Sequence, residues 1–268
     1  MKLFSVTQGR GADVVLLHGW ALHSGVWNEI ADTLAQYFRV TLIDLPGHGR
    51  SPIFPDAYSL SNLATHVLDV APPKAVWLGW SLGGMVAMQA ALEQPERLAG
   101  LVLVASSPRF VEAADWPHAV PVQVLQDFAQ DLQRDFRGTI RRFLALQMRG
   151  NTHTRDYLRI LNTRAFKHGE PSLVALQAGL SLLAETDLRK QLKDITCPTL
   201  LVMGENDTLI PLAAAEALVV MFKAAYSEVI PGAGHAPFLS HPQQFLQRVT
   251  AFLHETLHRN QRAGQTSA

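Results

Sequence analysis

The sequence has little cysteine and no excess of charge of either sign. Its 268 residues include a single cysteine, Cys197, which excludes an intramolecular disulfide and any zinc module built on several cysteines. Lysine plus arginine number 23, and so do aspartate plus glutamate. The total charge therefore does not favour a nucleic acid partner. Cys197 precedes Pro198 with no histidine nearby in sequence, and we interpret it as a packing residue in a reducing compartment.

Long hydrophobic runs are also missing. The longest clean apolar stretches, such as residues 101–105, are far shorter than the ~20 residues that a membrane-spanning helix needs. The first residues lack the apolar segment and the small-residue cleavage site of a secretion signal. We therefore expect a soluble, cytoplasmic protein that does not contact a membrane.

Short apolar runs alternate with longer segments of helical period along most of the chain. With 48% hydrophobic residues, the chain can bury a sizeable core. The expected strands are residues 13–17, 39–44, 75–79, 98–105, 199–203 and 225–230. The expected helices are residues 27–36, 59–70, 82–94, 212–221 and 242–258. Apolar strands that alternate with helices indicate an α/β fold with a mostly parallel sheet covered on both faces.

This alternation stops between about Pro108 and Asp187, where four helix-like pieces follow one another without a strand. We expect these pieces to form a helical lid over the sheet. The predicted organisation is a core made of residues 1–108 and 188–258, a lid made of residues 109–187, and a disordered tail at residues 259–268. The tail is assigned because its last ten residues are polar.

A nucleophile motif occupies the junction between one expected strand and the next helix. Residues 75–84 read AVWLGWSLGG, which contains G-x-S-x-G at Gly79, Ser81 and Gly83. In such an elbow the sharp turn lifts the serine hydroxyl above the sheet, and the glycines avoid a clash between strand and helix. The alternative is a glycine-rich turn with an idle serine. The strand before the motif and the helix after it favour Ser81 as a nucleophile.

A serine nucleophile needs a base and an acid that orients the base. In proteins with such an elbow, the acid and then the histidine come after the serine in the sequence, each on a loop that follows a late strand. Asp207 follows LLVMG and His235 follows YSEVIPGAG, so both residues fit this order. Glu205 is the nearest rival to Asp207. Among eleven histidines, His235 alone lies in a glycine-rich turn between a late strand and the final helix. We predict a catalytic triad of Ser81, Asp207 and His235.

The attacked carbonyl requires backbone N–H donors for its oxyanion. We expect one from Leu82, which follows the nucleophile, and one from Trp20 in the loop HGW at residues 18–20. The spacing of His18 to other histidines matches no metal motif, so a structural role in that loop is favoured. The segment LPGHGRS at residues 45–51 lacks the lysine of a phosphate loop. We predict no metal and no cofactor.

Together these motifs resemble the α/β-hydrolase superfamily. The motifs are HGW, DLPGHGRS, GWSLGG, GEND and GAGHAPF, in this order. The resemblance implies an α/β-hydrolase fold, in which a mostly parallel central sheet is flanked by helices and an all-helical lid is inserted after the sixth strand. More narrowly, WLGWSLGG, VASSPRF, RFLALQ and HAPFLSHP are similar to the pimeloyl-[acyl-carrier protein] methyl ester esterases of biotin synthesis.

The narrower resemblance implies a carboxylesterase that removes the methyl group from pimeloyl-acyl carrier protein and releases methanol. It also implies side activity on short-chain esters. The positions that match substrate contacts are Trp20, Ser81, Leu82, Phe143, Leu144, Ala145, Leu146, Gln147 and His235. Where the family often has glycine after HGW, this chain has Ala21, then Leu22 and His23. That departure leaves the shape of the pocket mouth open.

The expected lid is basic although the whole chain is neutral. Residues 134–167 hold eight arginines and one lysine against two aspartates, a local charge of 9 − 2 = +7. The spacing of Arg134, Arg137, Arg141 and Arg142 predicts one helix that carries them largely on one side. We predict that a monomer docks an acidic acyl carrier protein here. The predicted docking residues are Arg137, Arg141, Arg142, Arg155 and Arg159. The alternative is a solvated face.

Two other functions remain compatible with the residues. One is another Ser-His-Asp hydrolase, such as a C–C bond hydrolase or a lactonase. The other is a catalytically silent protein that holds a small apolar ligand in the same pocket. The complete set of Ser81, Asp207 and His235 argues against the silent protein.

Overall fold

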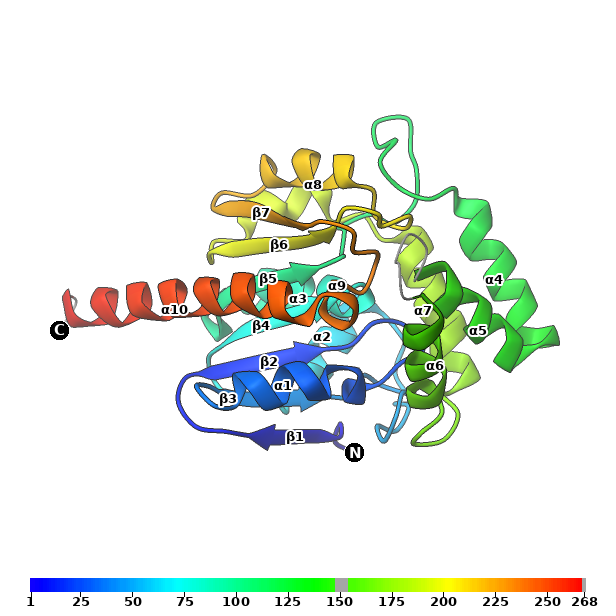
Figure 1. Cartoon of the computed structure of the whole chain (residues 1–268), viewed down its shortest axis with the longest axis horizontal. Helices are drawn as coiled ribbons and strands as arrows, with labels where there is room; N and C mark the ends of the chain where they lie inside the picture. Colours follow the sequence, from blue (N-terminus) through cyan, green and yellow to red (C-terminus); the bar gives the residue numbers. More distant parts are fainter. Residues whose placement is uncertain (148–153, 267–268) are drawn as a thin grey trace.

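The centre of the fold is one seven-stranded sheet, described by a computed structural model that covers residues 1–147 and 154–266 (Figure 1). The strands are β1 Ser5–Gln8, β2 Asp13–Leu17, β3 Arg39–Ile43, β4 Ala75–Trp80, β5 Leu98–Val104, β6 Thr199–Gly204 and β7 Ala225–Ile230. Their order in the sheet is β1-β3-β2-β4-β5-β6-β7. Strand β1 pairs with β3 antiparallel, and all other pairs are parallel. The six strands predicted from apolar runs are all present.

The burial of each strand explains which strands a hydrophobic run can reveal. Every residue of β4, β5 and β6 is buried, because these strands lie inside the sheet and helices cover both faces. Strand β1 is an edge strand, and three of its four residues are exposed. Its sequence SVTQ has no apolar run, so β1 escapes prediction from hydrophobicity alone.

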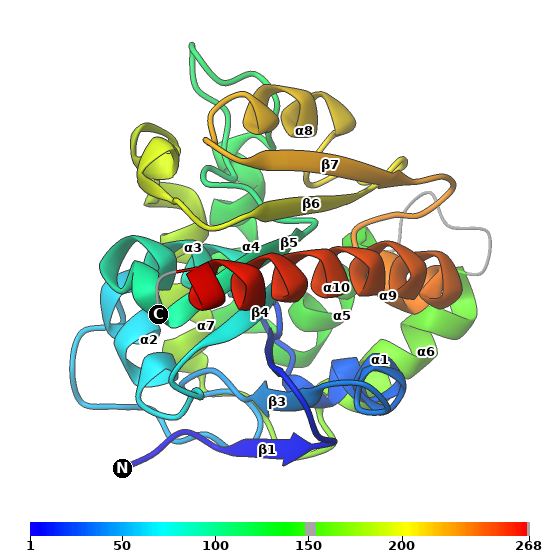
Figure 2. The same cartoon turned by 90° about the vertical axis from the view of Figure 1, so that its left-hand side faces the viewer.

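Helices cover both faces of the sheet. The helices outside the insertion are α1 Asn28–Leu34, α2 Leu60–Leu68, α3 Leu82–Glu93, α8 Leu212–Val219, α9 Pro237–Ser240 and α10 Pro242–Thr266. Helix α1 contacts α10 on one face, while α2 contacts α3 on the other, so the sheet lies between two helical layers (Figure 2). Three 3-10 turns accompany them, at Ser24–Trp27, Pro95–Arg97 and Arg189–Asp194. Among the described residues no helix is long and apolar enough to cross a membrane.

Four further helices lie between β5 and β6 and are called the inserted helices below. They are α4 Val122–Arg134, α5 Phe136–Gln147, α6 Thr154–Ala165 and α7 Leu173–Glu185. All four lie at the end of the molecule where the parallel strands finish (Figure 1). The expectation of an insertion after the sixth strand is wrong for this chain. Five strands precede the insertion, including the short edge strand β1, so the insertion follows β5.

The end of the chain also differs from its prediction. The polar sequence predicts a disordered tail at residues 259–268, but α10 continues through Thr266, and residues 267–268 lie outside the described residues. Figure 1 shows this helix projecting well beyond the sheet. Arg259 lies one helical turn after Glu255, and the two form an ion pair of 2.5 Å, which supports continuation of the helix. Polar composition alone therefore does not mark the end of a helix.

Candidate active site

Ser81 lies at a sharp turn between β4 and α3. Its backbone has φ 54° and ψ −118°, a left-handed conformation that is strained for a residue with a side chain. A side chain at Gly79 would collide with the backbone of Gly83 and Gly84, and one at Gly83 would collide with that of His18. The glycines of the G-x-S-x-G motif are therefore sterically required at this turn.

Three side chains from three loops meet above the sheet. His235 Nε2 lies 3.0 Å from Ser81 Oγ, and His235 Nδ1 lies 2.8 Å from Asp207 Oδ2. The serine follows β4, the aspartate follows β6 and the histidine follows β7. Parallel strands end at one edge of a sheet, so loops that are far apart in sequence converge there. The arrangement can deprotonate the serine hydroxyl through the imidazole.

All three side chains are shielded from solvent. Ser81 is 2% exposed, His235 is 1% exposed and Asp207 is 5% exposed. Asp207 Oδ1 accepts N–H groups from Leu209 at 2.8 Å and from Ile210 at 3.0 Å. These donors satisfy one oxygen of the buried carboxylate and leave Oδ2 directed at the imidazole. Electrostatic interactions in such a site are stronger than in water.

Glu205, the rival for the acid position, has a different place in the structure. Its side chain is exposed, and its Oε2 accepts the N–H of Gly232 at 2.8 Å. Glu205 therefore braces the loop that leads to His235 without reaching the imidazole. The structure brings Asp207, and not Glu205, to the histidine.

The loop of residues 18–20 lies directly beside Ser81. A side-chain carbon placed on Gly19 would lie only 3.3 Å from the Ser81 Cβ, so the two backbones are in close approach. The backbone N–H groups of Trp20 and Leu82 donate to no acceptor among the described residues. Both groups are therefore available for a developing oxyanion next to Ser81.

His18 ties this loop to the segment that follows β3. Its Nε2 accepts the N–H of Leu45 at 2.9 Å, and its Nδ1 lies 2.8 Å from the carbonyl oxygen of Gly19. The proton therefore sits on Nδ1, which donates to the Gly19 carbonyl. Burial lowers the pKa of His18 to about 3, and burial lowers that of the neighbouring His48 to about 4. Both histidines are neutral near pH 7 and act as structural groups.

Asp44 fastens the 3-10 turn that begins at Ser24, shortly after the same loop. Its carboxylate is buried and accepts the N–H of Ser24 at 2.8 Å and the N–H of Arg50 at 2.9 Å. Burial opposes its ionisation, but the attraction of His18 and the donors from Ser24 and Arg50 lower its pKa to about 2. Motif reasoning misses this role. The available signal is an aspartate directly after the buried strand β3.

The inserted helices cover the site. Trp20 Nε1 donates to the carbonyl of Leu176 in α7 at 2.8 Å, and its ring meets the edge of Phe143 in α5 at 4.6 Å between centroids. The last residue of α5, Gln147, accepts the backbone N–H of His235 at 3.2 Å through its carbonyl. The Gln147 side chain is 1% exposed, and its amide has no hydrogen-bond partner within the described part of the chain.

The predicted substrate contacts on α5 divide by burial. Phe143, Leu144 and Gln147 are buried, whereas Ala145 and Leu146 are half-buried. The three residues after HGW do not line an opening, because Ala21, Leu22 and His23 are all nearly fully buried. His23 Nε2 instead donates to the carbonyl of Arg164 at the end of α6, at 2.6 Å. Ala21 adopts a left-handed φ of 63°, which glycine tolerates better.

The predicted docking arginines are not equivalent. Arg137 pairs with Glu170 at 2.7 Å, and Arg142 pairs with Asp131 at 3.0 Å. Arg141 and Arg159 are exposed, and neither has an ion pair with another described residue. The side chain of Arg155 lies outside the described residues.

The expectation that one helix carries Arg134 with the other three arginines is wrong. Arg134 ends α4, and Asp135 Oδ1 accepts the N–H of Gly138 at 2.9 Å at the start of α5. A side-chain cap of this kind begins a new helix.

No three His, Cys, Asp or Glu side chains within the described ranges come together in a way that could hold a metal ion. Cys197 is a free, half-buried thiol, and burial raises its pKa to about 11. It therefore stays protonated near pH 7, which fits a packing residue.

Comparisons with known proteins agree with this geometry. Residues 14–248 match the model of the alpha/beta hydrolase family. The chain is 48% identical to a pimeloyl-[acyl-carrier protein] methyl ester esterase of Aeromonas salmonicida, over 91% of this chain and 96% of that protein. It is 47% identical to the protein of that name from Pectobacterium carotovorum, over 93% and 98%. An esterase structure from Exiguobacterium antarcticum superposes with a TM-score of 0.86 at 22% identity, over 94% of this chain and 95% of that one. The chain belongs to the alpha/beta hydrolase family.

Proposed function

We propose that this protein is a serine carboxylesterase that hydrolyses the methyl ester of pimeloyl-acyl carrier protein, in biotin synthesis. The observation that supports esterase chemistry most directly is the buried contact series from Ser81 to His235 to Asp207, at 3.0 and 2.8 Å. The substrate is inferred from relatives named pimeloyl-[acyl-carrier protein] methyl ester esterase that are 44–48% identical to this chain. No cofactor takes part in the proposed reaction.

The first half of the proposed reaction forms an acyl-enzyme. Ser81 Oγ attacks the ester carbonyl while His235 Nε2 takes its proton, and the backbone N–H groups of Trp20 and Leu82 bind the oxyanion. Asp207 keeps the His235 proton on Nδ1 and stabilises the imidazolium. His235 then gives its Nε2 proton to the methoxy oxygen, and methanol leaves.

The second half restores the serine. His235 takes a proton from a water molecule, and the resulting hydroxide attacks the acyl carbonyl on Ser81. The oxyanion again occupies the site next to Trp20 and Leu82. Collapse of this intermediate returns the proton to Ser81 and releases the free carboxylate of the pimeloyl chain. Each half uses the same base, so one histidine acts as base and acid in turn.

In this proposal the inserted helices act as a lid and form the wall along which the acyl chain lies. Trp20 and Phe143 contribute an apolar surface, with ring centroids 4.6 Å apart. The buried amide of Gln147, which has no partner among the described residues, supplies a polar group for the ester end of the chain. We place the lid at residues 109–187 and the core at residues 1–108 and 188–258.

Docking of the carrier protein is assigned to the arginines of α5 and α6. Arg141 and Arg159 are exposed without an ion pair to another described residue, so they can meet the acidic surface of a carrier at little cost in broken contacts. Arg137 and Arg142 would exchange their present carboxylate partners, Glu170 and Asp131, for those of the carrier. Arg155 completes the proposed set. The protein would act on this substrate as a monomer in the cytoplasm.

The experiment that tests this proposal compares the methyl ester of pimeloyl-acyl carrier protein with the same ester free in solution, at two salt concentrations. We expect hydrolysis of both, with a KM for the carrier-bound ester that rises with salt, because salt screens exposed charges. Equal salt dependence for the two substrates would contradict carrier docking. Lactones and C–C bond substrates in the same panel test the other hydrolase activities.

A further inference from the structure

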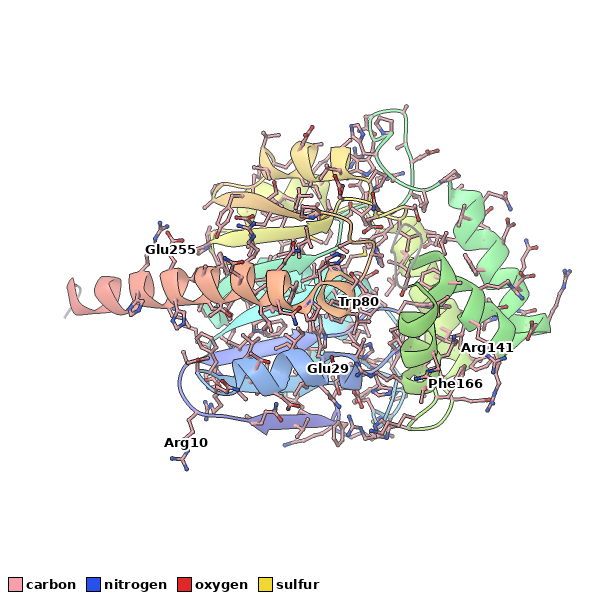
Figure 3. All side chains as sticks on the ribbon, viewed as in Figure 1. Arg10, Glu29, Trp80, Arg141, Phe166 and Glu255 are labelled. Carbon is pink, nitrogen blue, oxygen red and sulfur yellow. The ribbon has the colours of Figure 1, made fainter. Side chains whose placement is uncertain are left out.

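Trp80 is the residue between Gly79 and the nucleophile Ser81. It is the last residue of β4 and is fully buried at the centre of the molecule (Figure 3). Its indole Nε1 donates to the backbone carbonyl of His235 at 2.8 Å, across 155 residues of sequence. A side chain adjacent to the nucleophile therefore holds the main chain of the histidine.

The main chain of His235 has one hydrogen bond on each side. Its N–H donates to the carbonyl of Gln147 in α5 at 3.2 Å, and its carbonyl accepts the Trp80 indole. Asp207 contacts the imidazole itself, so it orients the ring about Nδ1. The two main-chain hydrogen bonds of His235 hold the backbone directly beneath that ring, and the one from Trp80 is the one that comes from the sheet.

The ring of Trp80 also touches the oxyanion loop. A side-chain carbon on Gly19 would lie 3.0 Å from Trp80 Cε3, so the loop backbone packs directly on the indole. The ring also meets Phe238 edge-on, with centroids 5.1 Å apart, and its centroid lies 5.9 Å from that of the His235 ring. One rigid side chain thus contacts the strand of Ser81, the loop of His235 and the loop of Trp20.

Trp77 on the same strand provides an internal comparison. It is also fully buried, but its Nε1 has no hydrogen-bond partner in the part of the chain that the structure describes. Residues three apart on a strand point to opposite faces of the sheet. Burial in β4 therefore does not by itself bring an indole N–H to a protein acceptor, and the bond from Trp80 to His235 is a specific feature of its position.

We propose that Trp80 is a positioning residue that sets the distance between the His235 imidazole and Ser81. This inference rests on the proposed roles of Ser81 and His235, but not on the identity of the ester. Without the indole donor, the His235 loop retains its contact with α5 and loses its tie to the nucleophile strand. The imidazole then spends less time at a productive distance from the serine hydroxyl.

The test replaces the indole with a ring that lacks the donor. For Trp80→Phe we expect kcat on a small p-nitrophenyl ester to fall about tenfold or more, because the rate falls sharply when the catalytic base is displaced from the nucleophile. We expect KM to change by less than about twofold, since the free ester binds without this group. Trp77→Phe removes an equally buried indole and should leave kcat unchanged. Thermal unfolding of both variants reports on their folding.

A second variant separates hydrogen bonding from packing. Incorporation of β-(3-benzothienyl)alanine at position 80 keeps the shape of the indole and replaces N–H with sulfur. A similar loss of kcat in this protein supports the proposal, and a normal kcat with folded protein overturns it. Phosphonylation by a fluorophosphonate probe should slow in parallel.

The failure of the proposed function and the failure of this inference give different results. A wild-type protein that neither hydrolyses the ester nor reacts with the probe overturns the proposed function itself. An active wild type with an equally active benzothienyl variant overturns only the role of Trp80.

Discussion

The sheet edge and the inserted helices hold their charged side chains in opposite ways. At the sheet edge, Asp44 and Asp207 are buried and each accepts at least two N–H groups. Among the inserted helices, Arg137 of α5 pairs with Glu170 in the segment between α6 and α7, and each side chain stays at least half exposed. Buried charges need fixed partners, whereas exposed pairs exchange readily with water and other proteins. This difference fits the proposed division, in which the first region carries out the chemistry and the second recognises the carrier.

The largest expected effect concerns the nucleophile. Replacement Ser81→Ala should lower kcat on a methyl ester by about 10⁶-fold, because the remaining groups cannot form an acyl-enzyme. The unfolding temperature should change little, which separates loss of chemistry from loss of fold. Hydrolysis at a near-native rate would show that Ser81 is not the nucleophile and that the reaction does not take place at the sheet edge.

The second comparison uses the two acids of the GEND motif. Asp207→Asn should lower kcat by about 10⁴-fold, since an amide at this place favours the wrong tautomer of His235. Glu205→Gln is the matched control, because the new side chain can still accept the N–H of Gly232. We expect it to change kcat by less than about threefold. Rates of ester hydrolysis measure both, and similar losses would show that burial does not distinguish the two acids.

The third comparison concerns stability in the two regions. Asp44→Asn should lower the free energy of unfolding by about 2 kcal/mol, because it removes the buried charge that binds Ser24 and Arg50. Glu170→Gln breaks an exposed pair and should cost at most about 0.5 kcal/mol. Urea unfolding at pH 7 gives both values. A larger loss for Glu170→Gln would reverse the contrast between the regions.

The smallest expected effect belongs to the exposed arginines. Arg141→Glu should raise the KM for the carrier-bound ester about three- to tenfold and leave the free ester unaffected. Arg10→Glu is the control with the same change in charge, since Arg10 lies at the opposite end of the molecule from Arg141 (Figure 3). Steady-state kinetics on both substrates measure the difference. Equal effects of the two reversals would mean that the total charge matters and the position does not.

The same contrast explains what the sequence could predict. Apolar runs locate the central strands because those strands are buried throughout, and the glycines around Ser81 are visible because packing permits no side chain there. Edge strand β1 has no such pattern. The partners of Arg137 and Arg142 come from other segments, so a count of charges overstates how much of the positive surface is free.

Contacts between residues that are far apart in the sequence are the part of the site that the sequence could not predict. Order and turn context select Asp207 and His235, because each follows a strand that must end at the same edge. The contact of Trp80 with the His235 carbonyl spans 155 residues and depends on the direction of one side chain. The break between α4 and α5 at Asp135 follows from one capping hydrogen bond, which helical spacing of arginines does not reveal.

Burial of His18 and His48 also makes the free energy of unfolding depend on pH. Their pKa values in the folded protein are about 3 and about 4, below the ordinary 6.5, so the unfolded chain binds protons first as the pH falls. Their contribution to stability is complete above pH 6.5 and declines toward pH 4. Between pH 7 and pH 5 the free energy of unfolding should fall by about 2 kcal/mol for each. His48→Gln should remove the His48 part of this pH dependence, measured by urea unfolding at pH 7 and pH 5, and an unchanged pH dependence would contradict the assignment. His18 in the loop of residues 18–20 and the neighbouring His48 thus make the whole protein less stable in acid.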